Sequence, residues 1–319
     1  MGVRFALAMI VFYFGTSLPA YKLAGDSFGP ATTNLIRFVI AAALLSAVSR
    51  GRLPVDRRVR RDLFVTGMFG LGLMALLMSI GVDEGSAVIG SVIVGLEPIG
   101  VALGGVLLAR ERLSSRTLLA LAIGFIGALV ASGIFTERTG PSPVVPVVLL
   151  LGTVVAFSWY TARVRTIAVG VDPLAVASLT QLGALTLVIP ACAIDLLNRF
   201  DTERPAAAVL RPLRGMVRGD IALSALGAGV YIGIGSAVSY LLLCRVLAKQ
   251  PVNRLAVTLY LTPVIGVLSS WLIVDERLHL RVAAGAALVL IAIAVSESRR
   301  SARPAVVEPA GPSASVSAS

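Results

Sequence analysis

Charged residues are scarce in this chain, and their scarcity excludes an ordinary soluble protein. Only 14% of the 319 residues are charged, whereas 57% are hydrophobic and the mean hydropathy is +0.91. A soluble domain carries roughly 25% charged residues and cannot bury so many apolar side chains in one core. The apolar surplus must face lipid, so a bilayer is the first predicted partner.

Residue types that commonly carry catalysis or bind metals are almost absent. The chain has one histidine, His279, and its two cysteines, Cys192 and Cys244, lie in apolar runs without metal-ligand spacing. The segment Gly25-Asp26-Ser27-Phe28-Gly29 matches the pattern of a serine nucleophile, but it connects two apolar runs far from that histidine. An intramembrane enzyme is therefore the least favoured class, and no cofactor or metal is expected.

Lysine is also scarce, and arginine dominates the charge. Two Lys and 26 Arg oppose 17 acidic residues, which gives a net charge of +11. The arginines cluster between apolar runs, as in cytoplasmic loops, so nucleic acid is not an expected partner. Six lie in 50–61, whereas 25–29 and 83–85 carry no basic residue. With an even number of spans, both termini of a multi-pass protein of the inner cell membrane are predicted to be cytoplasmic.

Ten apolar runs are long enough to cross the ~30 Å hydrocarbon layer as helices. They cover residues 5–24, 30–49, 63–82, 86–108, 117–134, 144–162, 173–197, 220–244, 254–274 and 279–296. The connection 198–219 carries five arginines, and either an external loop or a surface-lying amphipathic helix fits it. Residues 298–319, rich in Ser, Ala and Pro, are predicted to form a disordered cytoplasmic tail.

The two halves of the chain resemble each other. Residues 96–113 (LEPIGVALGGVLLARERL) align with 261–278 (LTPVIGVLSSWLIVDERL) at an offset of 165. Earlier in each half, Gly29-Pro30 resembles Asp172-Pro173 at an offset of 143. The difference of 22 residues (165 − 143) is most simply placed in 198–219.

An odd number of spans per repeat has a topological consequence. Five spans in each half, residues 1–140 and 141–297, require the second half to insert upside down if both fold alike. Inverted repeats are a transporter architecture, because two such halves can rock around a central site. The predicted fold is an all-α membrane protein of ten transmembrane helices arranged as two inverted five-helix repeats, although duplication without mechanistic consequence is the alternative.

These features resemble a known family. The paired halves, Pro98 and Pro263 in mid-span, the two ERL segments and Arg37 after Pro30 are similar to the drug/metabolite transporter superfamily, and specifically to EamA-type exporters. The resemblance covers about residues 5–297. It implies export of small metabolites, amino acids or drugs through a central cavity without ATP. The long 198–219 connection and the acid Glu97 depart from the common pattern.

Two charged side chains are predicted to lie inside the bilayer. Burying a charge there is costly, so each is expected to have a functional or a structural role. Glu97, at the centre of its run, suggests a proton or cation site, a group that binds an amine, or a structural partner for an arginine. Arg37 suggests a counter-charge to Glu97 or to a substrate carboxylate, or else a structural anchor. At the two offsets their counterparts are neutral, Thr262 for Glu97 and Thr180 for Arg37. Arg37 and Glu97 are therefore predicted to form a coupled pair.

Other polar residues are candidates for the cavity wall, although an interfacial belt is the alternative for Trp and Tyr. They are Thr16, Trp159, Tyr160, Gln181, Tyr240, Asn253, Tyr260 and Thr262. Glu111 and Glu276, together with Pro98 and Pro263, are interpreted as structural. Gly100 and Gly104 are predicted to allow close helix packing.

The function predicted from these features is a secondary transporter that exports a small metabolite by alternating access. The metabolite would be an amino acid or a similar compound, or a drug, and proton coupling is a further hypothesis. A channel or a non-transporting membrane scaffold is the alternative from another class. The substrate, the coupling ion, the direction of transport, and a monomeric or homodimeric state all stay open.

Overall fold

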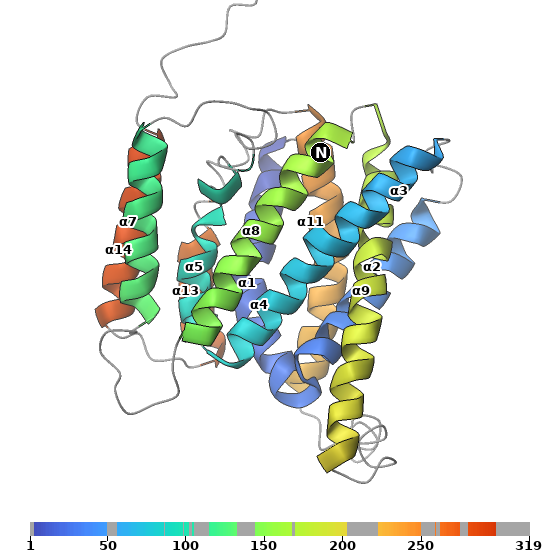
Figure 1. Ribbon diagram of the computed structural model, residues 1–319, viewed down its shortest axis with the longest axis horizontal. Coiled ribbons are helices and arrows are strands. Elements are labelled where there is room, and N and C mark those ends of the chain that lie inside the picture. Colours follow the sequence, from blue (N-terminus) through green and yellow to red (C-terminus); the bar gives the residue numbers. More distant parts are fainter. Residues whose placement is uncertain are drawn as a thin grey trace, which may run out of the picture.

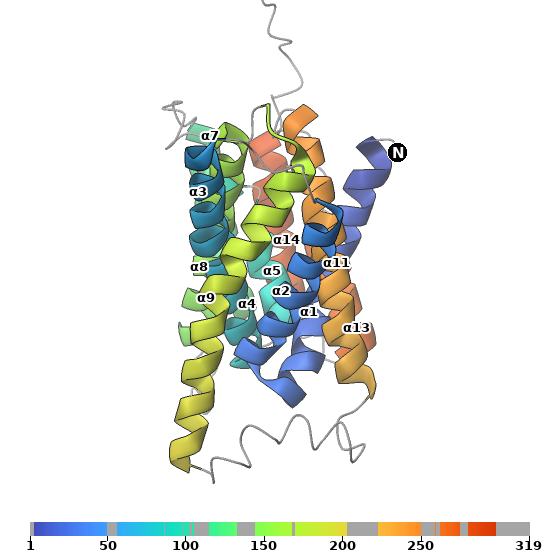
Figure 2. The ribbon, with the colours of Figure 1, turned by 90° about the vertical axis from the view of Figure 1, so that its right-hand side faces the viewer.

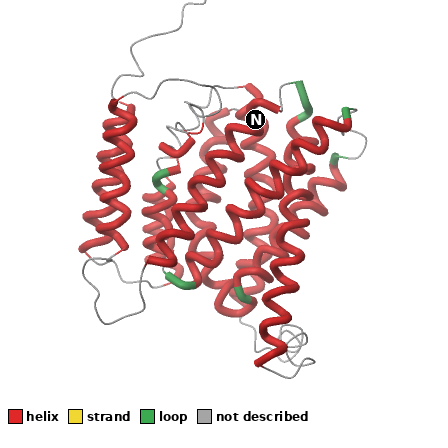
Figure 3. Tube along the Cα trace, viewed as in Figure 1, coloured by secondary structure: helices red, strands yellow, loops and turns green. Residues whose placement is uncertain are grey.

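Helices provide all the regular structure in the described part of the chain. The computed structural model describes residues 3–49, 56–85, 87–97, 99–101, 104, 115–132, 144–167, 170–202, 223–249, 259, 262–274 and 280–297. None of these residues lies in a strand (Figure 3). The helices lie side by side in one bundle, with most of their axes running roughly the same way (Figure 1). The predicted all-α class is confirmed for these residues.

The helix bounds follow the apolar runs closely. In chain order the elements are α1 (Val3–Phe28), α2 (Pro30–Val48), α3 (Arg57–Thr66), the π-helical segment η1 (Gly67–Gly72), α4 (Leu73–Asp83), α5 (Ala87–Val94), α7 (Ser115–Ser132), α8 (Val144–Ile167), α9 (Pro173–Thr202), α11 (Leu223–Lys249), α13 (Thr262–Val274) and α14 (Leu280–Glu297). Pro30 and Pro173 begin α2 and α9, where a missing N–H and a fixed φ suit a first helical turn.

Within the described residues, six helical stretches are long and apolar enough to cross a membrane. They are Arg4–Phe28, Pro30–Val48, Arg57–Asp83, Val144–Ile167, Pro173–Ile194 and Leu223–Ala248. The 18-residue helices α7 and α14 pack against each other, and α5 packs against α13. These helices describe a multi-pass membrane protein.

The third apolar run forms a longer helix than the sequence suggested. It begins at Arg57 rather than near residue 63, because the side chain of Asp56 accepts a hydrogen bond from the backbone N–H of Arg58 at 2.7 Å and caps α3. The arginines of 57–61 therefore lie on the first turns of a helix and not in a loop. Further along, η1 packs tightly on α9, where a Cβ on Gly67 would overlap the backbone of Thr180.

Several helices of the first half of the chain run opposite to helices of the second half. Helix α1 begins at the end of the bundle marked N and crosses to the other end, while α8 crosses the opposite way (Figures 1 and 2). In the same views α2 opposes α9, and the helix formed by α3, η1 and α4 opposes α11.

Polarity is distributed as expected for a protein surrounded by lipid. Large apolar side chains face outward, as for Val155 (70% exposed) and Leu272 (71%). Polar side chains such as Asn34, Gln181 and Ser236 are fully buried between helices. The interior therefore holds the hydrogen-bonding groups, which lipid could not satisfy.

Candidate functional site

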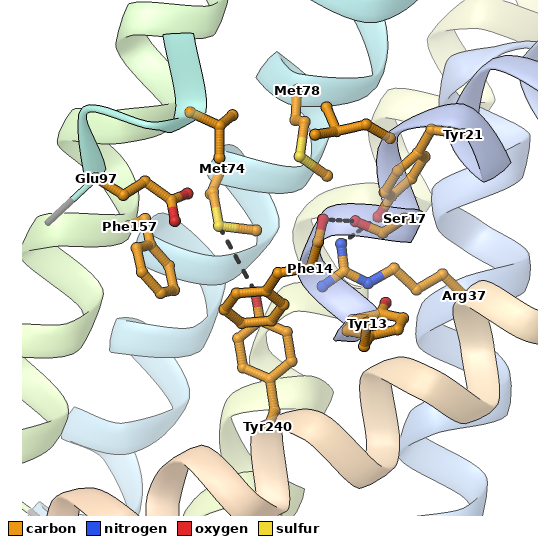
Figure 4. A pocket seen from close by; sticks show the side chains of 12 residues that line it. Tyr13, Phe14, Ser17, Tyr21, Arg37, Met74, Met78, Glu97, Phe157 and Tyr240 are labelled. Carbon is orange, nitrogen blue, oxygen red and sulfur yellow. Dashed lines mark hydrogen bonds between the residues drawn. The ribbon is translucent and has the colours of Figure 1, made fainter. Parts of the chain in front are cut away.

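A small pocket lies among helices from both halves of the chain. Side chains of α1, α2, α4, α8 and α11 line it together with Val94 of α5 and Glu97 just beyond (Figure 4). Its volume is about 30 Å³. On the order of two water molecules fill such a space, so a metabolite does not fit in this conformation. The polar side chains in its wall are Tyr13, Ser17, Tyr21, Arg37, Glu97 and Tyr240.

Arg37 is the most constrained charge of the pocket. Its side chain is 1% exposed, its Nε donates to Ser236 Oγ at 3.0 Å, and an Nη group donates to the Tyr21 hydroxyl. Its guanidinium carbon lies 4.6 Å from the ring centre of Phe38 and 5.5 Å from that of Tyr240. Hydroxyls and aromatic faces thus surround the cation, which ties α2 to α1 and α11.

Glu97 faces the pocket from its other side. The residue is 6% exposed, and none of the described residues donates a hydrogen bond to its carboxylate. Figure 4 shows this carboxylate pointing into the pocket beside Met74 and Phe157. A buried acid without a partner is costly in a bilayer, so this position calls for a proton or an incoming cation.

Arg37 and Glu97 form no ion pair in this conformation, and their predicted coupling stays a prediction. Both side chains line the same pocket, but no ion pair joins them. Met74, Phe14 and Tyr240 lie between the two charges (Figure 4). The sequence placed both residues at similar depth, but it could not show which side chains stand between them.

Hydroxyl and amide groups extend from Arg37 into the neighbouring helices. The Tyr21 hydroxyl donates to Asn34 Oδ1 at 3.4 Å, and Asn34 Nδ2 donates to Ser79 Oγ at 2.6 Å. On the opposite side, Ser236 also accepts a hydrogen bond from Gln181 Nε2 at 3.2 Å. These bonds connect the pocket to α4 and α9, so a change at Arg37 reaches four other helices.

Sequence reasoning missed several pocket residues. Tyr13, Ser17 and Tyr21 recur every fourth position on α1, and all three line the pocket. This spacing puts them on one helix face, which is a signal that could have found them. Phe14 and Met74 gave no signal, because apolar residues at helical spacing occur throughout the chain.

Among the other candidates that the structure describes, only Tyr240 lines the pocket. Tyr160 is fully buried one layer behind, with its ring 5.9 Å from that of Tyr240. Gln181 reaches the site only through Ser236. Burial excludes an interfacial position for Tyr160 and Tyr240. Thr16 hydrogen-bonds to the hydroxyl of Tyr231 on α11.

Two more candidates are set apart from the pocket. Trp159 is half-buried and packs near Gly70 of η1. Thr262 is 3% exposed, and its hydroxyl has no hydrogen-bond partner within the described ranges. Neither lines the pocket.

The remaining predicted residues cannot be placed. Asn253, Tyr260, Pro98, Glu111 and Glu276 lie outside the described residues, as do 203–222 and 298–319. Pro263 belongs to α13, but its side chain is outside the described part.

The close packing predicted for Gly100 and Gly104 is confirmed. A Cβ on Gly100 would lie 2.5 Å from Ser158 Oγ, and one on Gly104 would lie 3.2 Å from the carbonyl oxygen of Ser158. Both glycines thus let their segment approach α8. Among the described residues, no group of three His, Cys, Asp or Glu side chains could hold a metal ion.

Comparison with known families matches both halves of the chain separately. The model of the EamA-like transporter family matches residues 1–133 and again residues 145–297. The chain belongs to the EamA-like transporter family. The family resemblance drawn from the sequence is confirmed, and this EamA-like protein is a membrane transporter.

Individual relatives agree with this assignment. The EamA-like chain is 25% identical over 299 residues to an uncharacterized transporter of Archaeoglobus fulgidus, a match that covers 92% of this chain and 98% of the relative. A protein of known crystal structure superposes with a TM-score of 0.61 at 18% identity, over 93% of this chain and 96% of that one. That likeness concerns the fold alone.

Proposed function

We propose that this EamA-like protein is a secondary transporter that exports a small metabolite by alternating access. The observation that carries the proposal is the small pocket, which is lined by helices of both halves and holds two residues of opposite formal charge that are not paired with each other. At about 30 Å³ it must expand to take a metabolite. A site that closes around its cargo fits a carrier better than an open pore.

The proposed architecture is ten spans in two inverted five-helix repeats, residues 1–140 and 141–297. The spans are α1, α2, α3–η1–α4, α5 and α7 in the first repeat, and α8, α9, α11, α13 and α14 in the second. The opposite directions of α1 and α8, of α2 and α9, and of α4 and α11 support the inversion (Figures 1 and 2).

Helix neighbours also support a two-fold relation. Helix α1 packs on α11 and α13, and its proposed counterpart α8 packs on α4 and α5. Helix α2 packs on α11, and its counterpart α9 packs on η1. The pairs α2–α9, α5–α13 and α7–α14 contact each other, as elements on either side of a two-fold axis would.

The proposed cargo carries both a positive and a negative group, as an amino acid does. Arg37 would meet the negative group and Glu97 the positive one, because these are the two charges of the pocket wall. The surrounding rings and methionines would contact apolar parts of the cargo. Drugs with similar groups belong to the same proposal.

Proton coupling through Glu97 is part of the proposal. When the pocket is empty, a carboxylate at this position has no cation beside it among the described residues, so a proton would neutralise it. Binding of a cationic group would then release that proton. Export would use the proton gradient without ATP.

Transport itself is tested first by growth. A strain that overexpresses the protein is challenged with a panel of toxic amino acids, nucleobases and drugs, next to a strain with the empty vector. Resistance to one class is expected, and it names the cargo. The resisted compound is then used in proteoliposomes, where a carrier saturates and shows counterflow. Unsaturable flux without counterflow would instead identify a channel.

A further inference from the structure

The two charges of the pocket present an electrostatic puzzle. Arg37 and Glu97 are both buried, carry opposite formal charges and line one cavity, yet no ion pair joins them. In a medium of low dielectric constant, opposite charges attract strongly and a long arginine side chain can move toward its partner. Whenever Glu97 is ionised, a group between the two side chains must keep them apart.

Tyr240 occupies the intervening position. Its ring lies 5.5 Å from the guanidinium carbon of Arg37, and its hydroxyl donates to the sulfur of Met74 at 3.7 Å. Met74 in turn lies next to Glu97 (Figure 4). The ring and the thioether thus separate the cation from the carboxylate.

The ring of Tyr240 is held in place from several sides. Phe14 packs against it with ring centres 5.7 Å apart, and Tyr160 meets it edge-on at 5.9 Å. The side chain is 2% exposed. A ring confined in this way cannot swing aside without moving α1 or α8, so the separation is built into the helix packing.

Arg37 is also held away from Glu97 by its own partners. Ser236 and the Tyr21 hydroxyl both accept hydrogen bonds from the guanidinium. Tyr21 lies on the Arg37 side of Tyr240 (Figure 4). Glu97 has no comparable hydrogen bond among the described residues. The cation is therefore fixed, and the carboxylate is the group left for an incoming positive charge.

We propose that the ring of Tyr240, packed against Phe14 and Tyr160, is a partition that prevents Arg37 from neutralising Glu97 whenever Glu97 is ionised, so that both groups stay available to the cargo. Tyr240 is thus a positioning residue of the site. The inference rests on the proposed function for its purpose, but its physical content, two charges kept apart by one ring, is independent of transport.

The partition is tested by a double-mutant cycle on the purified full-length protein. Melting temperatures at one scan rate are compared for Arg37→Gln, Glu97→Gln and the double variant, in the wild-type, Tyr240→Phe and Tyr240→Ala backgrounds. In the first two backgrounds the ring remains, so the two single shifts should sum to the shift of the double variant. In Tyr240→Ala the two charges can pair. The melting temperature of the double variant should then fall by less than the sum of the falls in the two single variants.

Equal additivity in all three backgrounds would overturn the partition. If Tyr240→Ala does not fold, Tyr240→Leu, which also removes the ring, takes its place in the cycle. Tyr231→Ala on the same helix is the control, because this half-exposed tyrosine does not line the pocket. It should leave the additivity unchanged.

A growth assay then links the partition to transport. Resistance to the toxic amino acids of the panel should persist in Tyr240→Phe and fall at least about tenfold in Tyr240→Ala, because paired charges no longer bind the cargo. Full resistance in Tyr240→Ala would contradict the role given to the partition. Normal resistance in Arg37→Gln and Glu97→Gln would refute the proposed transport site instead, and the melting cycle would still decide the partition.

Discussion

At the scale of single residues, glycine decides how closely these helices approach. Gly67 of η1 and Gly183 of α9 sit where a Cβ would overlap the backbone of the opposing helix, at Thr180 and Phe64 respectively. Met74 of the pocket follows Gly67 by two turns, so this contact fixes the wall of the site relative to α9. In contrast, a Cβ on Gly227 of α11 would meet no neighbouring atom within 4 Å.

These two environments predict opposite outcomes for the same substitution. Gly67→Ala should destabilise the fold by about 1–3 kcal/mol, because backbone must shift to admit the methyl group. Gly227→Ala should be neutral or stabilising by up to about 1 kcal/mol, because alanine favours the helix. Melting temperatures in one detergent compare them, and a Gly67→Ala variant as stable as the control would contradict the packing.

The sequence revealed the charges of the site but not its neutral polar residues. Arg37 and Glu97 stood out because a charge in hydrocarbon needs compensation. Ser236 and Asn34 did not, because single hydroxyl and amide groups are common on apolar helices. Their importance comes from which helices pack together, and no single span encodes that arrangement.

At the scale of helices, many of the described helix ends lie within a few residues of the predicted ones, because a run of apolar residues must match the thickness of the bilayer. The number of ten spans stays a prediction. The π-helical segment was not predicted, since its glycines fit an ordinary close contact equally well. The structure also shows how the hydrogen bond that Pro19 removes from α1 is replaced. Proline has no N–H, so the carbonyl of Gly15 one turn earlier lacks its usual donor. Ser269 Oγ of α13 lies within hydrogen-bond distance of this carbonyl at 3.2 Å and of the Gly266 carbonyl in its own helix at 3.1 Å, so its one proton is shared between them.

Removing this donor should cost stability in a way that depends on Pro19. Ser269→Ala leaves the buried Gly15 carbonyl unpaired and should destabilise the protein by about 1–3 kcal/mol. In a Pro19→Ala background the backbone N–H returns, so the same change should cost much less. Ser270→Ala is the matched control, because that buried hydroxyl has no hydrogen-bond partner among the described residues. Equal losses for Ser269→Ala in both backgrounds would contradict this account.

At the scale of the whole molecule, charge and inversion together set the proposed topology. The arginines on the first turns of α3 lie at the end opposite Glu84, which follows α4 (Figure 1). Under the positive-inside rule the arginine end is cytoplasmic. Five spans per half then place both termini on that side.

Thiol labelling in intact cells tests this orientation. In a variant without Cys192 and Cys244, single cysteines are introduced at Arg57, Glu84 and Ser315. An impermeant thiol reagent should label the cysteine at Glu84 and spare those at Arg57 and Ser315, which should react only after the membrane is permeabilised. Labelling at Ser315 in intact cells would overturn the proposed location of the C-terminus.

The central claim is that Arg37 and Glu97 bind the cargo of a carrier, and flux tests it most directly. Initial counterflow of the resisted compound is measured in proteoliposomes with equal amounts of wild type, Arg37→Gln and Glu97→Gln. The exposed-charge variants Arg58→Gln and Glu84→Gln serve as controls. The flux of both pocket variants should fall at least about tenfold, because each leaves one cargo charge unmatched. Both controls should keep the wild-type flux. Wild-type flux in Glu97→Gln from about pH 5 to about pH 8 would contradict the claim, because the carboxylate would then be needed neither for the cargo nor for a proton.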